Sequence, residues 1–232
     1  MKTQRYTYDY IAGTDIHLWQ RSDMFRINTD TAQLAHFMKV RAGEGVHDIG
    51  TNNRALLLCA EQFSPSFLCG VDIQADACQL AERNLKEHGI SHAQILCGDF
   101  CEMDLQGFDV VVCNPPFFPM GHHGEVAATP RSIARHELFL PLDRLLSGAA
   151  RALKENGRLY MVHRSERLAD IVMECRNNRL EIKTLQLVYD LRKELAVSVL
   201  IEAVLGAAPH CRLPHPILLR PDGTFTQHEP DR

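Results

Sequence analysis

The sequence predicts an α/β protein built on a doubly wound, mostly parallel sheet. Three observations point to this class. Short apolar runs alternate with helical patterns from Val46 onward, the order that builds parallel sheets with right-handed crossovers. The run Phe108–Cys113 is apolar almost throughout, as in strands that are buried on both faces. A length of 232 residues allows one such domain with a substantial core.

The composition is that of an ordinary soluble protein, with 45% hydrophobic and 23% charged residues. Residues Met1–Tyr6 hold no apolar segment of signal-peptide type, and no apolar run approaches membrane-spanning length. We therefore expect a cytoplasmic protein with no membrane partner. Because most of the cysteines lie within apolar runs, we expect buried free thiols rather than disulfides. The cysteines on which this rests are Cys59, Cys69, Cys97 and Cys113.

Residues 5–40 are expected to form an extension ahead of the main fold. The β-like segments Tyr6–Tyr10 and Ile16–Gln20 flank a glycine-containing turn, which predicts a β-hairpin. Asn28 then begins a run of N-cap side chains, and the helical pattern that follows extends to Met38. Such a helix either lies across a ligand cleft or only packs against the core.

The elements of the main fold follow in order. Strands are expected at Val46–Gly50, Phe67–Asp72, Ala93–Cys97, Phe108–Cys113 and Arg158–His163. Helices are expected at Ala55–Glu61, Ala75–His88, Ser132–Leu153 and Ser165–Asn177. The β-rich segments Glu181–Tyr189 and Ala196–Leu205 are expected to pair as a terminal hairpin, and the Pro-rich residues 209–232 to form a loosely packed tail. With no long linker in the chain, residues 1–232 are expected to form one domain.

The Phe108–Cys113 strand ends abruptly in Asn114, Pro115, Pro116 and Phe117. The prolines cannot continue a central strand because they lack an N–H for the ladder, so a rigid loop begins at the carboxyl end of the strand. Ligands of open α/β sheets bind at this end. The Asn114 side-chain oxygen and the Pro115 carbonyl can accept the two N–H groups of a planar amine, while Phe117 stacks on its ring. An amine held in this way needs no acid, base or covalent nucleophile if the electrophile is a sulfonium methyl. These four residues are the candidate catalytic residues.

Three further strand ends carry candidate ligand residues. Gly50 makes a turn in which backbone can approach a ligand, although the G-x-G-x-x-G phosphate fingerprint is absent. Asp72, which lies 22 residues after Gly50, can accept both hydroxyls of a ribose. Asp99 can accept from an adenine amino group while Phe100 flanks the ring. Taken singly, each residue also fits a turn, capping or packing role.

The charge of the chain is uneven. The segment Arg131–Lys193 holds 13 Lys and Arg against 8 Asp and Glu, whereas the formal net charge of the chain is −4. This predicts a basic surface on an acidic protein, with solvated helix faces as the alternative. Cys97 with Cys101, and the pair His122-His123, are not accompanied by a second ligand pair at zinc-site spacing, so no metal is expected.

The motifs in this order resemble class I S-adenosylmethionine-dependent methyltransferases with an N-P-P-[YF] motif. The residues that carry this resemblance are Asp48-Ile49-Gly50, Asp72, Gly98-Asp99-Phe100 and Asn114-Pro115-Pro116-Phe117. The later runs Ile133–Glu137 and Gly157–Ile171 are similar to those of bacterial tRNA1(Val) (adenine-37-N6)-methyltransferases, in the branch typical of Gram-positive bacteria. The resemblance covers roughly residues 20–225.

The resemblance implies a Rossmann-like, seven-stranded sheet with an antiparallel last strand, the class I methyltransferase fold, and S-adenosyl-L-methionine as cofactor. Asp48 and Gly50 would line the methionine part of the cofactor, and Asn114 would border it. Asp72 would hold the ribose. Asp99 and Phe100 would hold the cofactor adenine, and Asn114 to Phe117 the target adenine. The sequence departs from the family at Arg54, where the loop usually carries glycine.

The implied reaction is methyl transfer to the N6 amine of an adenine in tRNA, at anticodon-loop position 37. An anticodon loop is single-stranded, so extruding a base from it costs less than from a duplex. The candidate phosphate contacts are Arg135, Arg164, Arg167, Arg192 and Lys193. The sequence leaves open the exact tRNA and the oligomeric state.

Three other functions stay open at this point. A guanine-N2 methyltransferase of rRNA can use the same acceptor pair, although those relatives tend to carry an extra domain. A glutamine-N5 protein methyltransferase grips a side-chain amide with the same motif, but carries a larger N-terminal helical domain. A degenerate RNA-binding module without catalysis is favoured only by Arg54.

Overall fold

The computed structural model describes residues 5–115, 140–193, 195–220 and 224–226. The strands, in chain order, are β1 Tyr6–Tyr10, β2 His17–Arg21, β3 Gly45–Ile49, β4 Phe67–Asp72, β5 Ala93–Cys97, β6 Phe108–Cys113, β7 Leu153–Arg164, β8 Leu180–Asp190, β9 Ala196–Leu205, β10 Ile217–Leu219 and β11 Phe225–Thr226. The helices are α1 Thr29–Phe37, α2 Ala55–Glu61, α3 Ala75–Glu87, α5 Leu142–Ala152 and α6 Leu168–Asn177. Two short 3-10 helices, η1 Phe100–Glu102 and η2 Ser165–Arg167, complete the described elements.

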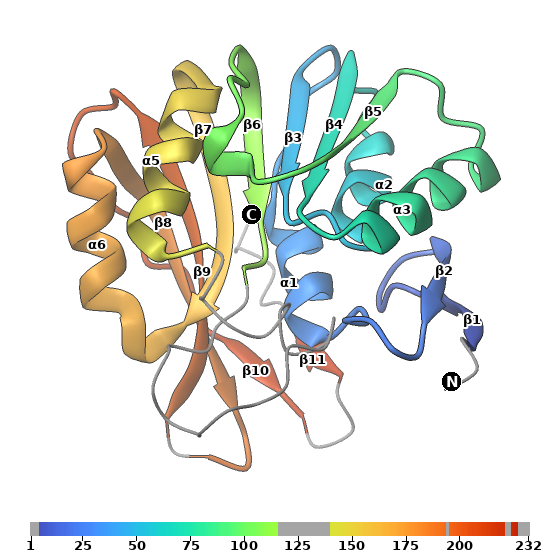
Figure 1. The fold of residues 1–232 in the computed structure, drawn as a ribbon. Helices are drawn as coiled ribbons and strands as arrows, with labels where there is room; N and C mark the ends of the chain where they lie inside the picture. Colours follow the sequence, from blue (N-terminus) through green and yellow to red (C-terminus); the bar gives the residue numbers. More distant parts are fainter. Residues whose placement is uncertain (1–4, 116–139, 194, 221–223, 227–232) are drawn as a thin grey trace, which may run out of the picture.

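A single large sheet runs through the molecule in the order β11-β10-β8-β9-β7-β6-β3-β4-β5 (Figure 1). Seven of these strands, from β8 to β5, form the expected sheet. The pairs from β7 through β6, β3 and β4 to β5 are all parallel. β9 runs antiparallel to both of its neighbours, β7 and β8. The predicted fold class, including the antiparallel last strand of the seven, is therefore confirmed.

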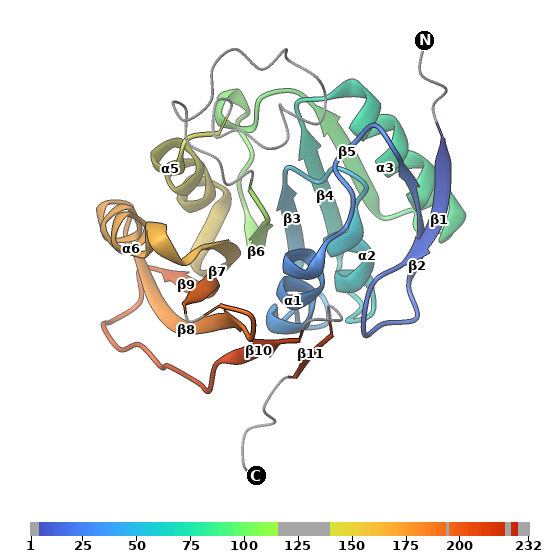
Figure 2. The ribbon, with the colours of Figure 1, turned by 90° about the horizontal axis from the view of Figure 1, so that it is seen from below.

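Helices cover both faces of the sheet and bury two apolar cores. Side chains of α1 and α2 pack on one face, and those of α5 and α6 pack on the other. The two layers are separated in the view from below (Figure 2). The middle of β6 is buried from both sides, since Val110, Val111 and Val112 are all 0% exposed. This double burial explains why the β6 sequence is apolar almost without a break.

Three elements differ from the expectation. Of the helix predicted at Ser132–Leu153, residues 132–139 lie outside the described residues, and α5 begins at Leu142 because Pro141 occupies its N-cap position. The strand predicted from Arg158 begins at Leu153, with an irregularity in its pairing to β6 and Asn156 in a left-handed conformation. Cys97 is exposed rather than buried, because β5 is the edge strand of the sheet.

The described part of the C-terminal residues is also more ordered than a loosely packed tail. β10 pairs in parallel with β8, and β11 pairs antiparallel with β10. Ile217 at the start of β10 is 0% exposed and belongs to the core beside α1 and α2. A run of three apolar residues, Ile217–Leu219, in a Pro-rich segment is too short a pattern to predict this strand.

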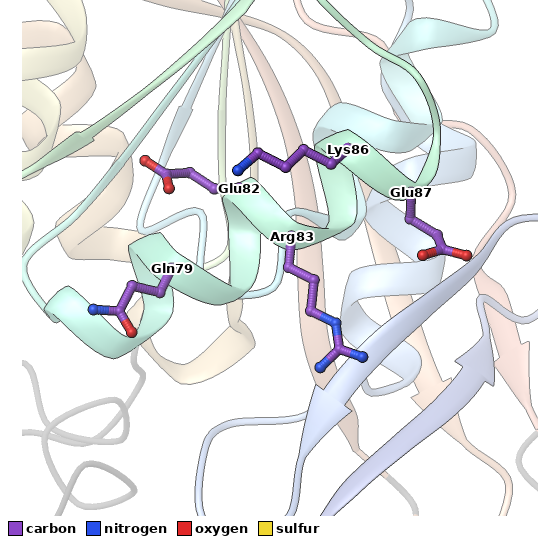
Figure 3. Close-up of a pocket in the computed structure, with 5 residues that line it drawn as sticks. All are labelled: Gln79, Glu82, Arg83, Lys86 and Glu87. Atoms are coloured by element: carbon purple, nitrogen blue, oxygen red, sulfur yellow. The ribbon is translucent and has the colours of Figure 1, made fainter.

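The predicted N-terminal hairpin is present as the antiparallel pair β1–β2, which lies against α3. Asn84 of α3 joins the two elements, because its Oδ1 accepts from the backbone N–H of Trp19 at 2.8 Å and its Nδ2 donates to the Trp19 carbonyl at 3.1 Å. The Arg83 guanidinium lies 4.0 Å from the Trp19 ring centroid. Figure 3 shows Arg83 reaching toward this hairpin from the outer face of α3. A shallow pocket lies on the same face, and none of the predicted site residues lines it.

Candidate active site

The predicted site residues lie in one row at the carboxyl ends of adjacent strands. Val71 of β4 pairs with Ile49 of β3, and Ile49 pairs with Cys113 of β6. The residues that follow these three in the chain are Asp72, Gly50 and Asn114, so the parallel register brings them to the same edge. This edge is where an open α/β sheet binds its ligands.

Asn114 is held by helix α1. Its Nδ2 donates a hydrogen bond to Thr31 Oγ1 at 3.0 Å. Its Oδ1 is buried and has no hydrogen-bond partner among the described residues. Because buried amide oxygens are nearly always paired, this oxygen is available to accept a hydrogen bond from a ligand. Pro115, which carries the second proposed acceptor, is buried directly after it.

The Asp72 carboxylate is fixed by backbone donors. Its Oδ2 accepts from the N–H of Asn52 and its Oδ1 from the N–H of Gln74, each at 2.9 Å. Burial raises the pKa of Asp72, and the backbone N–H groups of Gln74, Asn52 and Ile73 act to lower it. Each oxygen keeps a further lone pair, so the oriented carboxylate still has the capacity to accept two hydroxyl groups.

Asp48 lies deeper in the same edge. Its side chain is 1% exposed, and no described residue forms a hydrogen bond with its Oδ1. Burial raises the pKa of Asp48 to about 7, the Thr51 hydroxyl and the Arg54 charge lower it, and the nearby Asp72 raises it further. The Asp72 charge therefore disfavours ionisation of the Asp48 carboxyl, and a cation bound nearby would relieve this effect.

The loop after β3 has the backbone shape that glycines favour. Gly50, Asn52 and Arg54 all have positive φ angles, of 73°, 44° and 72°. Glycine adopts this left-handed region at no steric cost and asparagine tolerates it, whereas arginine is uncommon there. Gly70 on β4 leaves room for the loop, since a Cβ at that position would meet Thr51 Oγ1 at 2.8 Å.

Arg54 does not point to solvent. The residue is 0% exposed, and its Nε, Nη1 and Nη2 atoms find no hydrogen-bond partner in the described part of the chain. Burial lowers the pKa of Arg54 to about 10, and the charges of Asp48, Cys69 and Glu61 act in the opposite direction. The side chain therefore interacts electrostatically with Asp48 beneath the loop instead of projecting into the ligand edge from outside.

The N-terminal extension forms hydrogen bonds with this loop. Asn52 Nδ2 donates to the Phe25 carbonyl at 2.6 Å, and Asn53 Nδ2 donates to Gln20 Oε1 at 3.3 Å. Asn84 Nδ2 also donates to the Asn53 carbonyl at 2.8 Å. The asparagines that stand in this loop thus connect it to β2 and to α3.

Asp99 and Phe100 follow β5 and diverge from each other. Asp99 caps η1, accepting from the Cys101 N–H at 2.9 Å, and forms an ion pair with Arg144 at 3.4 Å. Phe100 is 5% exposed and packs in the core, with its ring centroid 5.3 Å from that of His47. A role for either residue toward an adenine stays a prediction that rests on the resemblance.

The candidate RNA contacts form two groups. Arg164 ends β7 and Arg167 ends η2, and Arg167 forms an ion pair with Asp170 at 2.7 Å. Arg192 and Lys193 lie in the turn after β8, where Arg192 is paired with Asp190 at 2.8 Å. Because β7 and β8 run in the same direction, both groups lie toward the edge that holds Asn114. Pro116, Phe117 and Arg135 lie outside the described residues.

Among the described residues, no group of three or more His, Cys, Asp or Glu side chains is arranged to hold a metal ion. No helix in the described part of the chain is long and apolar enough to cross a membrane. All eight cysteines are free thiols, as expected.

Thr31 contacts the candidate site residue Asn114, but no sequence pattern singles Thr31 out. The N-cap run beginning at Asn28 was recognised, and Asn28 does cap α1. The contact between Thr31 and Asn114, however, joins residues 83 positions apart. A single sequence carries no local pattern for such a contact.

The sequence is similar to that of known proteins. The methyltransferase small domain family matches residues 22–186. A tRNA1(Val) (adenine(37)-N6)-methyltransferase of Porphyromonas gingivalis is 29% identical over 196 residues, which cover 74% of this chain and 76% of the relative. An enzyme of the same name from Vibrio vulnificus is 32% identical over 141 residues, covering 59% of this chain and 57% of the relative.

Solved structures show the same fold at low sequence identity. A predicted O-methyltransferase from Agrobacterium tumefaciens superposes with a TM-score of 0.64 at 15% identity, covering 84% of this chain and 89% of that one. Trm5b from Pyrococcus abyssi superposes with a TM-score of 0.61 at 14% identity, covering 86% of this chain and 56% of that one. Because the family match spans well over half of the sequence, this chain belongs to the methyltransferase small domain family and has the class I methyltransferase fold.

Proposed function

We propose that this methyltransferase transfers the methyl group of S-adenosyl-L-methionine to the N6 amine of an adenine in tRNA, at anticodon-loop position 37. The observation that carries the proposal is the Asn114 amide at the end of β6, whose oxygen is buried, oriented and, within the described part of the chain, without a hydrogen-bond partner. The names of the relatives from Porphyromonas gingivalis and Vibrio vulnificus support tRNA adenine as the acceptor.

The residues at the strand ends fit the methyl donor. S-adenosyl-L-methionine supplies an electrophilic methyl group on a positively charged sulfur. The buried Asp72 carboxylate, together with the ionised fraction of the Asp48 carboxyl, favours such a cation at this edge. The backbone N–H groups of Asn52 and Gln74 orient Asp72 to accept from the two ribose hydroxyls. Asp99 and Phe100 are assigned to the adenine of the donor on the resemblance alone.

The acceptor amine is activated by orientation. An exocyclic amine on adenine is a poor nucleophile because its lone pair is delocalised into the ring. When Asn114 Oδ1 and the Pro115 carbonyl each accept one N–H, the nitrogen lone pair is directed toward the electrophile. Preorganised acceptors of this kind lower the barrier because they need no rearrangement during the reaction. Phe117 is proposed to stack on the adenine ring, which contributes about 1–3 kcal/mol.

The proposed tRNA surface adjoins this edge. Arg164 and Arg167 at the end of β7 are the first candidates for phosphate contacts, and Arg192 and Lys193 after β8 are the next. Arg135 is a further candidate from the sequence. A single-stranded anticodon loop would let the target base leave its stack at a cost of a few kcal/mol or less. A cytoplasmic location follows from such a substrate and stays a prediction.

The experiment is nucleoside analysis after incubation of the protein with unmodified tRNA and S-adenosylmethionine that carries a labelled methyl group. We expect labelled N6-methyladenosine, lost when the adenine at position 37 of the transcript is replaced by guanine. Label only on guanine N2 would favour the guanine alternative, and label only on protein the glutamine alternative. Calorimetric titration with the methyl donor tests the non-catalytic alternative, which predicts no binding.

A further inference from the structure

A short chain of hydrogen bonds connects the start of helix α1 to Asn114. The N-cap residue Asn28 accepts at its Oδ1 from the backbone N–H of Thr31 at 2.9 Å. The Thr31 hydroxyl donates to the same Asn28 oxygen at 3.0 Å. Thr31 Oγ1 in turn accepts from Asn114 Nδ2 at 3.0 Å. Thr31 is 6% exposed, so water is largely kept from this contact.

The direction of this chain is fixed at its first member. A backbone N–H can only donate, so the Asn28 atom that it meets must be the amide oxygen. The Thr31 hydroxyl has a single proton, and that proton lies on the Asn28 oxygen. Only a lone pair of Thr31 is left for Asn114. The Asn114 atom that faces Thr31 must therefore be the amide nitrogen.

The opposite orientation of the Asn114 amide would lose a hydrogen bond in one of two ways. If its oxygen faced Thr31, two oxygens would meet without a proton unless Thr31 released Asn28. Releasing Asn28 would remove a hydrogen bond within the cap of α1. The present arrangement leaves Asn114 Oδ1 facing away from Thr31 and buried, with no partner in residues 5–115, 140–193, 195–220 and 224–226.

We propose that Thr31 is a positioning residue for methyl transfer: together with Asn28 it holds the Asn114 amide in the one orientation that presents Oδ1 to the acceptor amine. This inference rests on the proposed function, because it assigns to Asn114 the acceptor role described above. It gives α1, in the N-terminal extension, a part in catalysis without any contact with the substrate. The reversed amide would present an N–H group to the amine of the base and repel it.

The test uses conservative variants of the full-length protein. Thr31→Val keeps the shape of the side chain but removes the acceptor for Asn114. We expect kcat to fall about 10- to 100-fold, as for a reacting group held in the wrong geometry. The Kd for S-adenosylmethionine should stay within about twofold, and Thr31→Ser should restore most of the rate, because it restores the hydroxyl. Thr29→Val, two residues earlier on the same helix, is the matched control and should leave kcat unchanged.

A further variant tests the donor-to-acceptor direction of this hydrogen-bond chain. Asn28→Asp keeps an acceptor at the first position and remains a good helix N-cap. We expect kcat to fall much less in this variant than in Thr31→Val, because the chain needs only acceptor oxygens at residue 28. If Asn28→Asp lowered kcat as much as Thr31→Val does, the direction argued above would be wrong and the proposal overturned.

A second readout separates this inference from the proposed function. The side-chain amide of Asn114 can be assigned in a nitrogen–proton NMR spectrum by its loss in Asn114→Ala. Slow hydrogen exchange of this amide in the wild type, and faster exchange in Thr31→Val but not in Thr31→Ser, would support the hydrogen-bond chain even if no nucleoside were methylated. Unchanged exchange in Thr31→Val, or equal loss of kcat and of cofactor binding in that variant, would overturn the positioning role.

Discussion

Arg54 is a charged residue in a buried position that does not suit its side chain or its backbone conformation. It has a left-handed backbone that favours glycine, and its guanidinium is buried without a hydrogen-bond partner from any described residue. A buried charge that lacks a close partner is destabilising, and replacing it by an apolar residue of similar length often stabilises a protein. The electrostatic interaction with Asp48 offsets only part of this cost, because the Asp48 carboxyl is itself partly protonated near neutral pH.

We predict that Arg54→Met raises the free energy of unfolding by about 1–3 kcal/mol at pH 6. Methionine fills much of the same volume without a charge, and urea denaturation of the cofactor-free protein measures the change. Arg54→Lys is the matched control, because it keeps the charge and should not stabilise. A loss of stability in Arg54→Met would show that the guanidinium contributes more through Asp48 than its burial costs.

Asp48 gives the second prediction at this scale. Its pKa in the folded protein is about 7, against an ordinary value of 3.8, because burial disfavours the charged form. For a group with a raised folded pKa, stability is complete below the unfolded pKa and is lost as the pH rises through the folded pKa. Relative to Asp48→Asn, the wild type should therefore lose about 3 kcal/mol between pH 5 and pH 8.

The measurement is the difference in free energy of unfolding between wild type and Asp48→Asn across that pH range. Taking the difference cancels other titrating groups, including His47 and His163, whose pKa values burial lowers to about 4. Asp104→Asn, in an exposed loop, is the control and should show no such trend. A difference that is independent of pH would contradict the buried, protonated state of Asp48.

At the scale of elements, the N-terminal extension acts as a brace for the loop after β3. Asn84 is 0% exposed and bonds to both backbone groups of Trp19 and to the carbonyl of Asn53. These bonds link the hairpin, α3 and the loop that contains Asn52 and Arg54. The asparagines in the loop take part in this bracing, which glycines could not.

We predict that Asn84→Ala lowers the free energy of unfolding by about 2–4 kcal/mol, since it leaves buried backbone groups unpaired. It should also weaken binding of S-adenosylmethionine, because the Asn53 end of the loop loses its support. Urea denaturation and calorimetric titration measure the two effects. Gln79→Ala, on the exposed face of the same helix, should change stability by less than about 0.5 kcal/mol. If Asn84→Ala and Gln79→Ala had equal free energies of unfolding and equal cofactor affinities, Asn84 would not stabilise the loop.

The strands of the main fold could be predicted closely from the sequence. β4, β5, β6 and α2 begin and end at the predicted residues, because apolar runs bounded by Gly, Asp and Pro are local signals. The start of α5 was predicted too early because the helical pattern was continued through Pro141. In the short strand β10 only Ile217 is buried, and the local sequence pattern is too short to predict this strand.

The candidate site could be predicted only in part. Parallel register made it possible to expect Asp72, Gly50 and Asn114 at one edge. What could not be predicted are contacts between distant segments, such as Thr31 with Asn114, and the direction of a side chain, such as that of Arg54. Both depend on how the N-terminal extension packs against the sheet, which a single sequence does not encode in any local pattern.

At the scale of the whole molecule, the two edges of the sheet differ in chemistry. The carboxyl edge holds the site residues, with Arg164 and Arg167 at the end of β7. The amino edge holds ion pairs such as Lys154 with Asp109 at 2.8 Å and Arg179 with Glu155 at 2.8 Å. The proposed tRNA surface therefore faces the viewer in Figure 2.

We predict that Arg164→Gln and Arg167→Gln each weaken tRNA binding for all tRNA sequences alike. Each lost phosphate contact should reduce the slope of log Kd against log salt concentration by about 1. Fluorescence titration at several salt concentrations measures this slope. Arg179→Gln, on the opposite edge, is the control. Equal slopes in all four proteins would place the tRNA elsewhere.

The central claim is that the Asn114 amide grips the adenine amine at the end of β6. The most direct measurement is the yield of N6-methyladenosine from unmodified tRNA with wild type and with Asn114→Ala, at saturating S-adenosylmethionine, with exposed Asn177→Ala as control. We predict that Asn114→Ala forms no detectable product while the Kd for the cofactor stays nearly unchanged, and that Asn177→Ala matches the wild type. Product formation by Asn114→Ala at the wild-type rate, or an equal loss of product and of cofactor binding, would contradict the account.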